Sequence, residues 1–258
     1  MSLPFNSIDI PPAQGHPHTH TVIFLHGRGD DNGPFRDSLQ HWRDSRNSTL
    51  TQAFPTFRWV LPQAPMREMA SYPGQRVRIW FDNWNVRDLT EREELQADGL
   101  REIIPVFREL ITLEAARLGG RSDRIVIASF SQGGAAGAHL LFNSDVPLAA
   151  FMGFSCRCPF ARRSLSQMRE VVGVFGRAPD DDDCLRKTPV LLEHCVGDPI
   201  VPIESGRVLR DTLRGFGCQV DMREYTDGGH WLHLPTGLDD VVTFLEENVI
   251  KKTQAEDA

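Results

Sequence analysis

The sequence predicts an α/β fold in which a mainly parallel central sheet is covered by helices on both faces. Short apolar runs alternate along the chain with longer amphipathic stretches, which is the pattern of βαβ units. The apolar runs are continuous, and this indicates strands that are buried on both sides. One run ends abruptly at a serine followed by small residues, which is the layout of a sharp strand-to-helix turn.

The elements follow from these patterns. Strands are expected at residues 21–26, 57–61, 125–130, 148–154, 190–195 and 219–225. Helices are expected at about 34–46, 92–118, 132–143, 203–215 and 236–250. The chain has no internal repeat and no dividing linker, so we expect a single domain over residues 1–258 with its core at about 20–250. Residues 157–188 lack periodicity and contain four consecutive aspartates, which predicts an excursion on the surface.

The bulk composition excludes several classes of protein. The 258 residues carry a formal net charge of −7, and no basic stripe suited to nucleic acid stands out. No apolar run approaches the roughly 20 residues of a membrane span, and residues 1–20 do not resemble a secretory signal. The five cysteines are odd in number and unpaired in spacing, so we expect reduced thiols and a cytoplasmic protein without stable membrane insertion.

The residues around Ser131 are the most informative for function. Residues 124–137 read RIVIASFSQGGAAG, so that a run of β-branched and small residues reaches Ser131 and glycines follow. A strand-to-helix turn of this kind exposes a nucleophilic serine, and small residues are needed two positions before and after it. Gly133 meets this requirement, whereas Ser129 stands where the G-x-S-x-G pattern has glycine. The alternative is an ordinary buried strand followed by a Gly/Ser turn.

A serine hydroxyl needs a neighbouring base, and the base needs an orienting acid. Asp198 follows the strand expected at 190–195 and fits the acid; the alternative is a structural turn before Pro199. His230 follows the last expected strand on a glycine-rich loop and fits the base. His233 is its competitor. The chain order Ser, Asp, His is that of α/β-hydrolases.

Such a site also needs backbone N–H groups directed at the developing oxyanion. One donor is expected from Gln132, the residue after the nucleophile. The second is expected from a loop after an early strand, and Arg28 in the sequence HGRGD is the candidate.

With these residues assembled, the chain resembles the acyl-protein thioesterase and phospholipase/carboxylesterase family of α/β-hydrolases. The resemblance rests on motifs in the family order: VIFLHGRGD at 22–30, WFD at 80–82, FSQGG at 130–134, GDPIVP at 197–202 and GGH at 228–230. It implies the triad Ser131, Asp198 and His230, the oxyanion donors Arg28 and Gln132, and neither a metal nor an organic cofactor.

The resemblance also bears on the substrate. It implies that the segment from about Leu61 to Trp80 and the 157–188 loop wall the acyl-binding channel, with Trp80 and Arg157 as substrate-binding residues. The family usually has an aliphatic residue at Arg28 and commonly tryptophan at Arg157. The two arginines argue against a long-chain lipid and favour an acyl or leaving group that carries negative charge.

We therefore expect a serine hydrolase that cleaves carboxylic esters or thioesters through an acyl-enzyme on Ser131. Its substrate would be a small molecule or an acylated protein, and a weak homodimer is a further expectation. An acyltransferase with the same acyl-enzyme and a non-catalytic binding protein on the same fold are the alternatives. Three histidines at alternate positions, 16, 18 and 20, suit a metal on one face of a strand, although a polar lead-in to the first strand is favoured.

Overall fold

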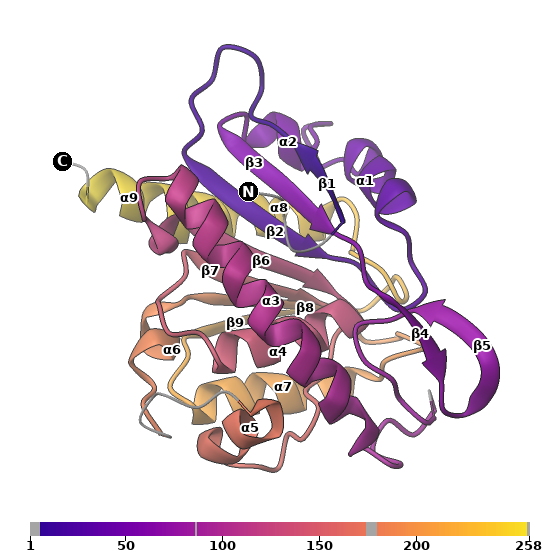
Figure 1. The fold of residues 1–258 in the computed structure, drawn as a ribbon. Helices are drawn as coiled ribbons and strands as arrows, with labels where there is room; N and C mark the ends of the chain where they lie inside the picture. The colour runs from indigo at the N-terminus through magenta and orange to yellow at the C-terminus, as the bar shows by residue number, and fades with distance from the viewer. Residues whose placement is uncertain (1–5, 86, 174–179, 257–258) are drawn as a thin grey trace.

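A seven-stranded sheet forms the centre of the computed structural model, which describes residues 6–85, 87–173 and 180–256. The strand order is β1-β3-β2-β6-β7-β8-β9, and every neighbouring pair is parallel except β1 with β3. The strands are β1 (Ser7–Ile10), β2 (His20–Leu25), β3 (Phe57–Pro62), β6 (Ile125–Phe130), β7 (Ala150–Phe154), β8 (Val190–Cys195) and β9 (Val220–Tyr225). A separate hairpin of β4 (Met66–Met69) and β5 (Tyr72–Arg78) extends from one end of the sheet (Figure 1).

Helices cover both faces of the sheet, as the sequence predicts. One face carries α3 (Leu95–Arg117), α4 (Gln132–Phe142), α5 (Leu165–Val172) and α7 (Ile203–Gly215), whose apolar side chains share one core cluster. The other face carries α1 (Asn32–His41) and α8 (Thr236–Leu245), which share a second cluster. The remaining helices of the described residues are α2 (Leu50–Ala53), a 3-10 turn (Ser122–Arg124), α6 (Asp183–Lys187), a π-helical turn (Glu246–Ile250) and α9 (Lys251–Glu256). In Figure 1 α3 runs diagonally across the front of the sheet, and α8 lies behind it.

The central strands show why continuous apolar runs indicate this architecture. Successive side chains of a strand point to opposite faces of the sheet. Ile125 and Ile127 of β6 therefore enter the cluster beneath α3 and α4, whereas Val126 and Ala128 enter the cluster beneath α8. All four are at most 1% exposed, so neither face of β6 offers a position for a polar side chain that needs water.

The expected strands agree with the structure to within two residues at each end. The helix expected at 203–215 coincides with α7, and the other expected helices are found with shifted boundaries. The sequence did not predict β1, the β4–β5 hairpin, α2 or α9. These elements are short, and most side chains of β1 and of the hairpin are at least partly exposed, so they carry no apolar periodicity.

The expectation of a surface excursion at 157–188 is wrong for much of its described part, which comprises 157–173 and 180–188. Helix α5 packs against α3 and α4 (Figure 1), and its Met168 is fully buried. Cys158, Phe160 and Leu185 also belong to the main core cluster. A capping box at Ser164 and Gln167 begins α5, and this S-x-x-Q signal in the sequence was available to locate the helix.

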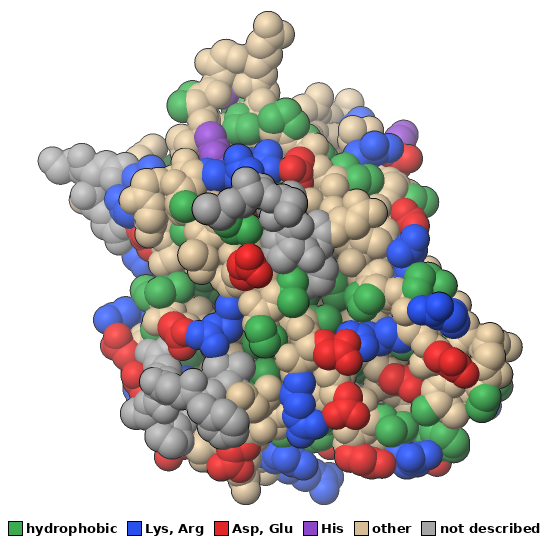
Figure 2. Space-filling model, in the orientation of Figure 1, with side chains coloured by type: hydrophobic (Ala, Val, Ile, Leu, Met, Phe, Trp, Pro, Cys, Tyr) green, Lys and Arg blue, Asp and Glu red, His purple; other side chains and the backbone are tan. Residues whose placement is uncertain are grey.

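The surface is consistent with the modest net charge. On the face shown in Figure 2, acidic and basic side chains are interspersed rather than gathered by sign. Within the described ranges, no helix is both long enough and apolar enough to cross a membrane.

Candidate active site

Ser131 lies at the junction between β6 and α4, where the chain turns from strand to helix within one residue. Its backbone is in a strained region, with φ 54° and ψ −118°, and its N–H donates to the carbonyl of Phe154 on β7 at 2.9 Å. The turn brings α4 against β2. A Cβ on Gly133 would lie 2.5 Å from the carbonyl oxygen of His26, so only glycine fits there. The sharp turn predicted from the sequence is therefore present.

The structure explains how Ser129 replaces the glycine of the usual pattern. Its hydroxyl donates to the carbonyl oxygen of Met152 at 3.0 Å, which satisfies a polar group that is 0% exposed. The space comes from Gly137 on the facing turn of α4, where an added Cβ would lie 3.0 Å from Ser129 Oγ. In this protein the small residue is therefore needed at Gly137 on the helix rather than at position 129 on the strand.

Ser131, His230 and Asp198 form one continuous hydrogen-bonded line. His230 Nε2 lies 2.9 Å from Ser131 Oγ, and His230 Nδ1 lies 2.8 Å from Asp198 Oδ2. Ser131 follows β6, Asp198 follows β8 and His230 follows β9. The carboxyl ends of these strands lie at one edge of the sheet, where open α/β sheets place their ligands. Because Asp198 accepts at Nδ1, Nε2 of the neutral imidazole is left to accept the serine proton.

Asp198 is 7% exposed and is held as a carboxylate by its surroundings. Burial raises its pKa, but hydrogen bonds from His194, His230 and the N–H groups of Val201 and Ile200 outweigh burial and hold the pKa well below its ordinary value of 3.8. His194 is the partner that the sequence analysis missed. Its Nε2 lies 3.5 Å from Asp198 Oδ2 and 2.8 Å from the carbonyl oxygen of Val201.

His233, the competitor for the base, belongs to a different contact. Its Nε2 lies 2.9 Å from Asp227 Oδ1, and its ring stacks on Tyr225 with centroids 4.2 Å apart. It makes no hydrogen bond to Ser131, so the geometry favours His230.

Gln132 and Arg28, the residues expected to supply N–H groups to an oxyanion, line the same cavity as Ser131. The N–H of Gln132 is in the first turn of α4, where backbone donors have no partner within the helix and the helix dipole is positive. Arg28 follows β2. Among the described residues its N–H has no hydrogen-bond acceptor, whereas that of Gly29 donates to Arg78 on β5.

The side chain of Gln132 fixes one wall of the site. Its Oε1 accepts from the N–H of Trp80, and its Nε2 donates to the carbonyl of Phe81 and to Asn83 Oδ1. The Trp80 side chain is 0% exposed and donates through Nε1 to the carbonyl of His26. Trp80 thus supports the loop after β2 from behind and does not line the pocket.

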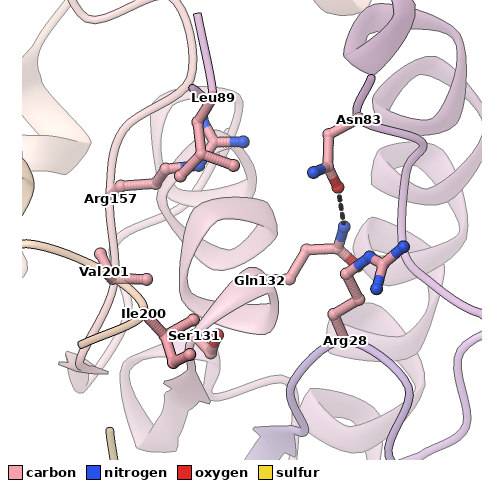
Figure 3. A pocket seen from close by; sticks show the side chains of 8 residues that line it. All are labelled: Arg28, Asn83, Leu89, Ser131, Gln132, Arg157, Ile200 and Val201. Carbon is pink, nitrogen blue, oxygen red and sulfur yellow. Dashed lines mark hydrogen bonds between the residues drawn. The ribbon is translucent and has the colours of Figure 1, made fainter. Parts of the chain in front are cut away.

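A pocket of about 70 Å³ opens beside Ser131 (Figure 3). Its lining residues are Arg28, Asn83, Leu89, Ser131, Gln132, Arg157, Ile200 and Val201. The structure therefore brings the two arginines singled out in the sequence to the nucleophile. Asn83, Leu89, Ile200 and Val201 were not predicted, because a pocket wall built from loops leaves no periodic signal in the sequence.

The cysteines and the N-terminal histidines lie outside this chemistry. All five cysteines are buried, and no disulfide joins them in the described structure. His18 and His20 contact the hydroxyl groups of Thr21, Thr19 and Thr253. Across the described residues, no cluster of three or more His, Cys, Asp or Glu side chains suits a metal ion.

The arrangement is suited to acyl transfer. It combines a serine in contact with a histidine base, an ionised orienting acid, two N–H groups for an oxyanion and a pocket for one substituent of the carbonyl group. The side chains and backbone of the protein supply each of these groups. Water would be the second substrate.

Comparison with known proteins points to the same chemistry. The model of the phospholipase/carboxylesterase family matches residues 11–249. The curated acyl-protein thioesterase 1 of Gibberella zeae is 30% identical over 91% of this chain and 93% of its own length. The Schizosaccharomyces pombe protein of the same name is 32% identical over 78% of each chain.

The architecture also matches solved structures. The acyl-protein thioesterase 2 of Zea mays superposes with a TM-score of 0.74 over 95% of this chain and 99% of that one, at 22% sequence identity. An esterase superposes with a TM-score of 0.68 at 24% identity, again over 95% and 99%. At these identities the superpositions establish the fold alone.

Proposed function

Because this chain belongs to the phospholipase/carboxylesterase family, we propose that it hydrolyses its substrate through an acyl-enzyme on Ser131, with His230 as base and Asp198 as orienting acid. The chain has the α/β-hydrolase fold and is a hydrolase of carboxylic esters or thioesters. The observation that carries the assignment of residues is the line from Ser131 Oγ through His230 to Asp198, with contacts of 2.9 and 2.8 Å.

The reaction has two halves. In the first, Ser131 Oγ attacks the carbonyl carbon while His230 Nε2 takes its proton, and the oxyanion is bound by the N–H groups of Gln132 and Arg28. Collapse of the tetrahedral intermediate breaks the bond to the alcohol or thiol, which leaves with the proton from His230. In the second half, water attacks the acyl-enzyme with His230 again as base, and the carboxylic acid is released.

The substrate is an ester or thioester of a small molecule or of an acylated protein. The names of the curated relatives, acyl-protein thioesterase 1, support the second class. We also propose a cytoplasmic location, on the ground that the five cysteines, all within the described ranges, form no disulfide. The weak homodimer expected from the sequence stays a prediction, to be tested by sedimentation of the purified chain over a range of concentrations.

The experiment that tests the residue assignment compares wild type with Ser131→Ala and His230→Ala on a p-nitrophenyl ester and on an acyl thioester. We expect each variant to lose at least about 10³-fold in kcat, and a fluorophosphonate probe to label wild type but not Ser131→Ala. The variant Ser205→Ala, at a half-buried position in the first turn of α7, is the matched control. Full turnover by Ser131→Ala would overturn the assignment.

A further inference from the structure

We propose that the part of the substrate held in the pocket beside Ser131 ends in a carboxylate, and that the Arg157 guanidinium binds it. The proposal rests on the function proposed above and specifies its substrate class: half-esters or half-thioesters of dicarboxylic acids, or esters of a carboxylate-bearing alcohol or thiol. Two features support it: the few groups that contact Arg157, and the position of its side chain relative to Ser131.

Arg157 is a nearly buried cation, and most of its N–H donors make no hydrogen bond to a described residue. The residue is 9% exposed and lines the pocket. A guanidinium has five N–H donors, but among the described residues the only hydrogen bond of Arg157 runs from Nη2 to Gln96 Oε1, at 2.6 Å. The guanidinium carbon also lies over the Phe81 ring, 5.9 Å from its centroid.

The same molecule shows how a partly buried arginine is otherwise satisfied. The side chain of Arg58 is 13% exposed, and it is paired with Glu114 at 3.0 Å and with Asp9 at 2.6 Å. Arg157 has no such ion pair within the described part of the chain. Taking a cation out of water without a paired anion is costly, so the pocket that Arg157 lines favours an anionic group.

Glu93 is the acidic group that acts on Arg157 from its surroundings. Burial lowers the pKa of Arg157 to about 10, and Glu93 opposes this shift, so the guanidinium stays charged at neutral pH. The Glu93 carboxylate is held elsewhere, since its Oε1 accepts the N–H of Phe160 at 2.7 Å. It therefore balances part of the charge, and within the described structure it forms no hydrogen bond or ion pair with the guanidinium.

The position of Arg157 suits the far end of a short chain. In Figure 3 Arg157 lies with Leu89 away from Ser131, and Ile200 and Val201 lie on the same side of the pocket. A substrate carbonyl at Ser131 would thus be followed by apolar walls that accept methylene groups and then by the guanidinium. A carboxylate is the anion that the planar guanidinium binds best, through two parallel hydrogen bonds.

Arg28 adds a second positive charge to the same pocket. It enters from the side opposite Arg157 (Figure 3). Its Nη2 lies 2.8 Å from the sulfur of Met69, which is a weak acceptor, and its buried Nε has no partner among the described residues. Neither arginine is neutralised by an acidic lining residue, so the field in the pocket favours an anion.

The test uses two pairs of esters that differ in one charge. On the acyl side, p-nitrophenyl hemiadipate is compared with p-nitrophenyl hexanoate. On the leaving-group side, 4-acetoxybenzoate is compared with its methyl ester. We expect wild type to prefer the charged member of at least one pair by about 10- to 100-fold in kcat/KM, the range of a hydrogen-bonded charge pair. The pair that shows the preference identifies which part of the substrate enters the pocket.

The variant Arg157→Gln should abolish this preference, and Arg157→Lys, which keeps the charge without the planar fork, should keep part of it. Arg162→Gln, at an exposed position on the same segment, should keep all of it. Absence of a charge preference in both pairs with wild type overturns the proposal whether or not Arg157→Gln folds. An unchanged ratio in folded Arg157→Gln overturns it as well.

A separate assay shows whether it is the proposed role of Ser131, rather than the carboxylate proposal, that is wrong. Ser131→Ala is assayed on the same four esters, and its residual rate reports turnover that does not use Ser131. If that rate equals the wild-type rate, the residue assignment is wrong. If Ser131→Ala is inactive while wild type ignores the charge, only the carboxylate proposal fails.

Discussion

His194 lies beside Asp198 as a second histidine on the carboxylate of the proposed triad. Its Nε2 is 3.5 Å from Asp198 Oδ2, the oxygen that also lies 2.8 Å from His230 Nδ1. Because the same Nε2 lies 2.8 Å from the carbonyl oxygen of Val201, which only accepts, the proton of His194 belongs on Nε2. His194 is thus a positioning residue that ties Asp198 and Val201, in the loop after β8, to the strand itself.

Replacement of His194 by phenylalanine should therefore reduce kcat by about 10-fold with little change in KM, the lower end of the range for a hydrogen bond to a charged group. The aromatic ring keeps the packing against Gly206, but the donor to Asp198 and Val201 is lost. His194→Gln places an amide donor where Nε2 was and should restore most of kcat. Steady-state kinetics on one ester checks both variants. A drop in stability with unchanged kcat would show a role in folding only.

The turn at Ser131 gives a second prediction, which concerns glycine. Gly133→Ala should destabilise the protein by about 3 kcal/mol or more, since the new Cβ would lie 2.5 Å from the carbonyl of His26 and neither backbone can move away. Gly197→Ala, next to Asp198, meets nothing within 4 Å and serves as the matched control. Thermal unfolding measures both. Equal melting temperatures for the two variants would contradict the close approach of α4 to β2.

Ser129 belongs to the same turn and should respond mildly. Ser129→Ala removes the hydrogen bond to the carbonyl of Met152 but adds no atom against Gly137, so a loss of about 1 kcal/mol with nearly unchanged kcat is expected. The same unfolding and ester assays apply. A loss of activity as large as that of Ser131→Ala would mean that Ser129 takes part in the chemistry.

How far the sequence predicts this molecule depends on the range of the interactions involved. The buried strands and the order of Ser131, Asp198 and His230 follow from local composition and chain order, because β6, β8 and β9 end at the same edge of the sheet. His194 escaped the analysis because its position in an apolar strand suggests core packing, and only the turn at Val201 brings Asp198 back to it.

The pocket depends on contacts between distant segments. Arg157 meets Gln96, 61 positions away, and Arg28 meets Met69 on a hairpin without apolar periodicity. From the sequence Phe160 and Met168 are expected in a surface loop. The apolar residues of α3 and α4 that share their core cluster are distant in the sequence, so local patterns do not indicate the contact. Trp80 illustrates the converse: its motif was recognised, yet whether the indole faces the pocket or the core was decided by the carbonyl of His26.

The thiols give a fourth prediction. Burial raises the pKa of Cys156 and of Cys218 to about 12, and that of Cys195 is raised as well, so little thiolate is present at neutral pH. Treatment with iodoacetamide at pH 7.5 should leave esterase activity intact, and intact mass should show no adduct until the protein is unfolded. Rapid inactivation with a single adduct would place a reactive cysteine at the site.

His139 gives the last prediction, which concerns stability and pH. The residue is 0% exposed on α4; its Nε2 lies 3.0 Å from the carbonyl of Pro159, and its Nδ1 has no partner in the described structure. Burial lowers its pKa from 6.5 to about 4. The unfolded chain therefore takes up a proton at a higher pH than the folded chain, and protonation favours unfolding.

The stability associated with neutral His139 is fully present above pH 6.5 and should be lost as the pH falls from 6.5 to 4. A shift of this size corresponds to about 3 kcal/mol. His139→Gln keeps a donor for Pro159 but cannot titrate, so its stability relative to wild type should rise by about that amount between pH 7 and pH 4. Urea unfolding at several pH values measures the difference, and titration of the other groups cancels in it. A difference that stays constant with pH would show that His139 titrates alike in both states.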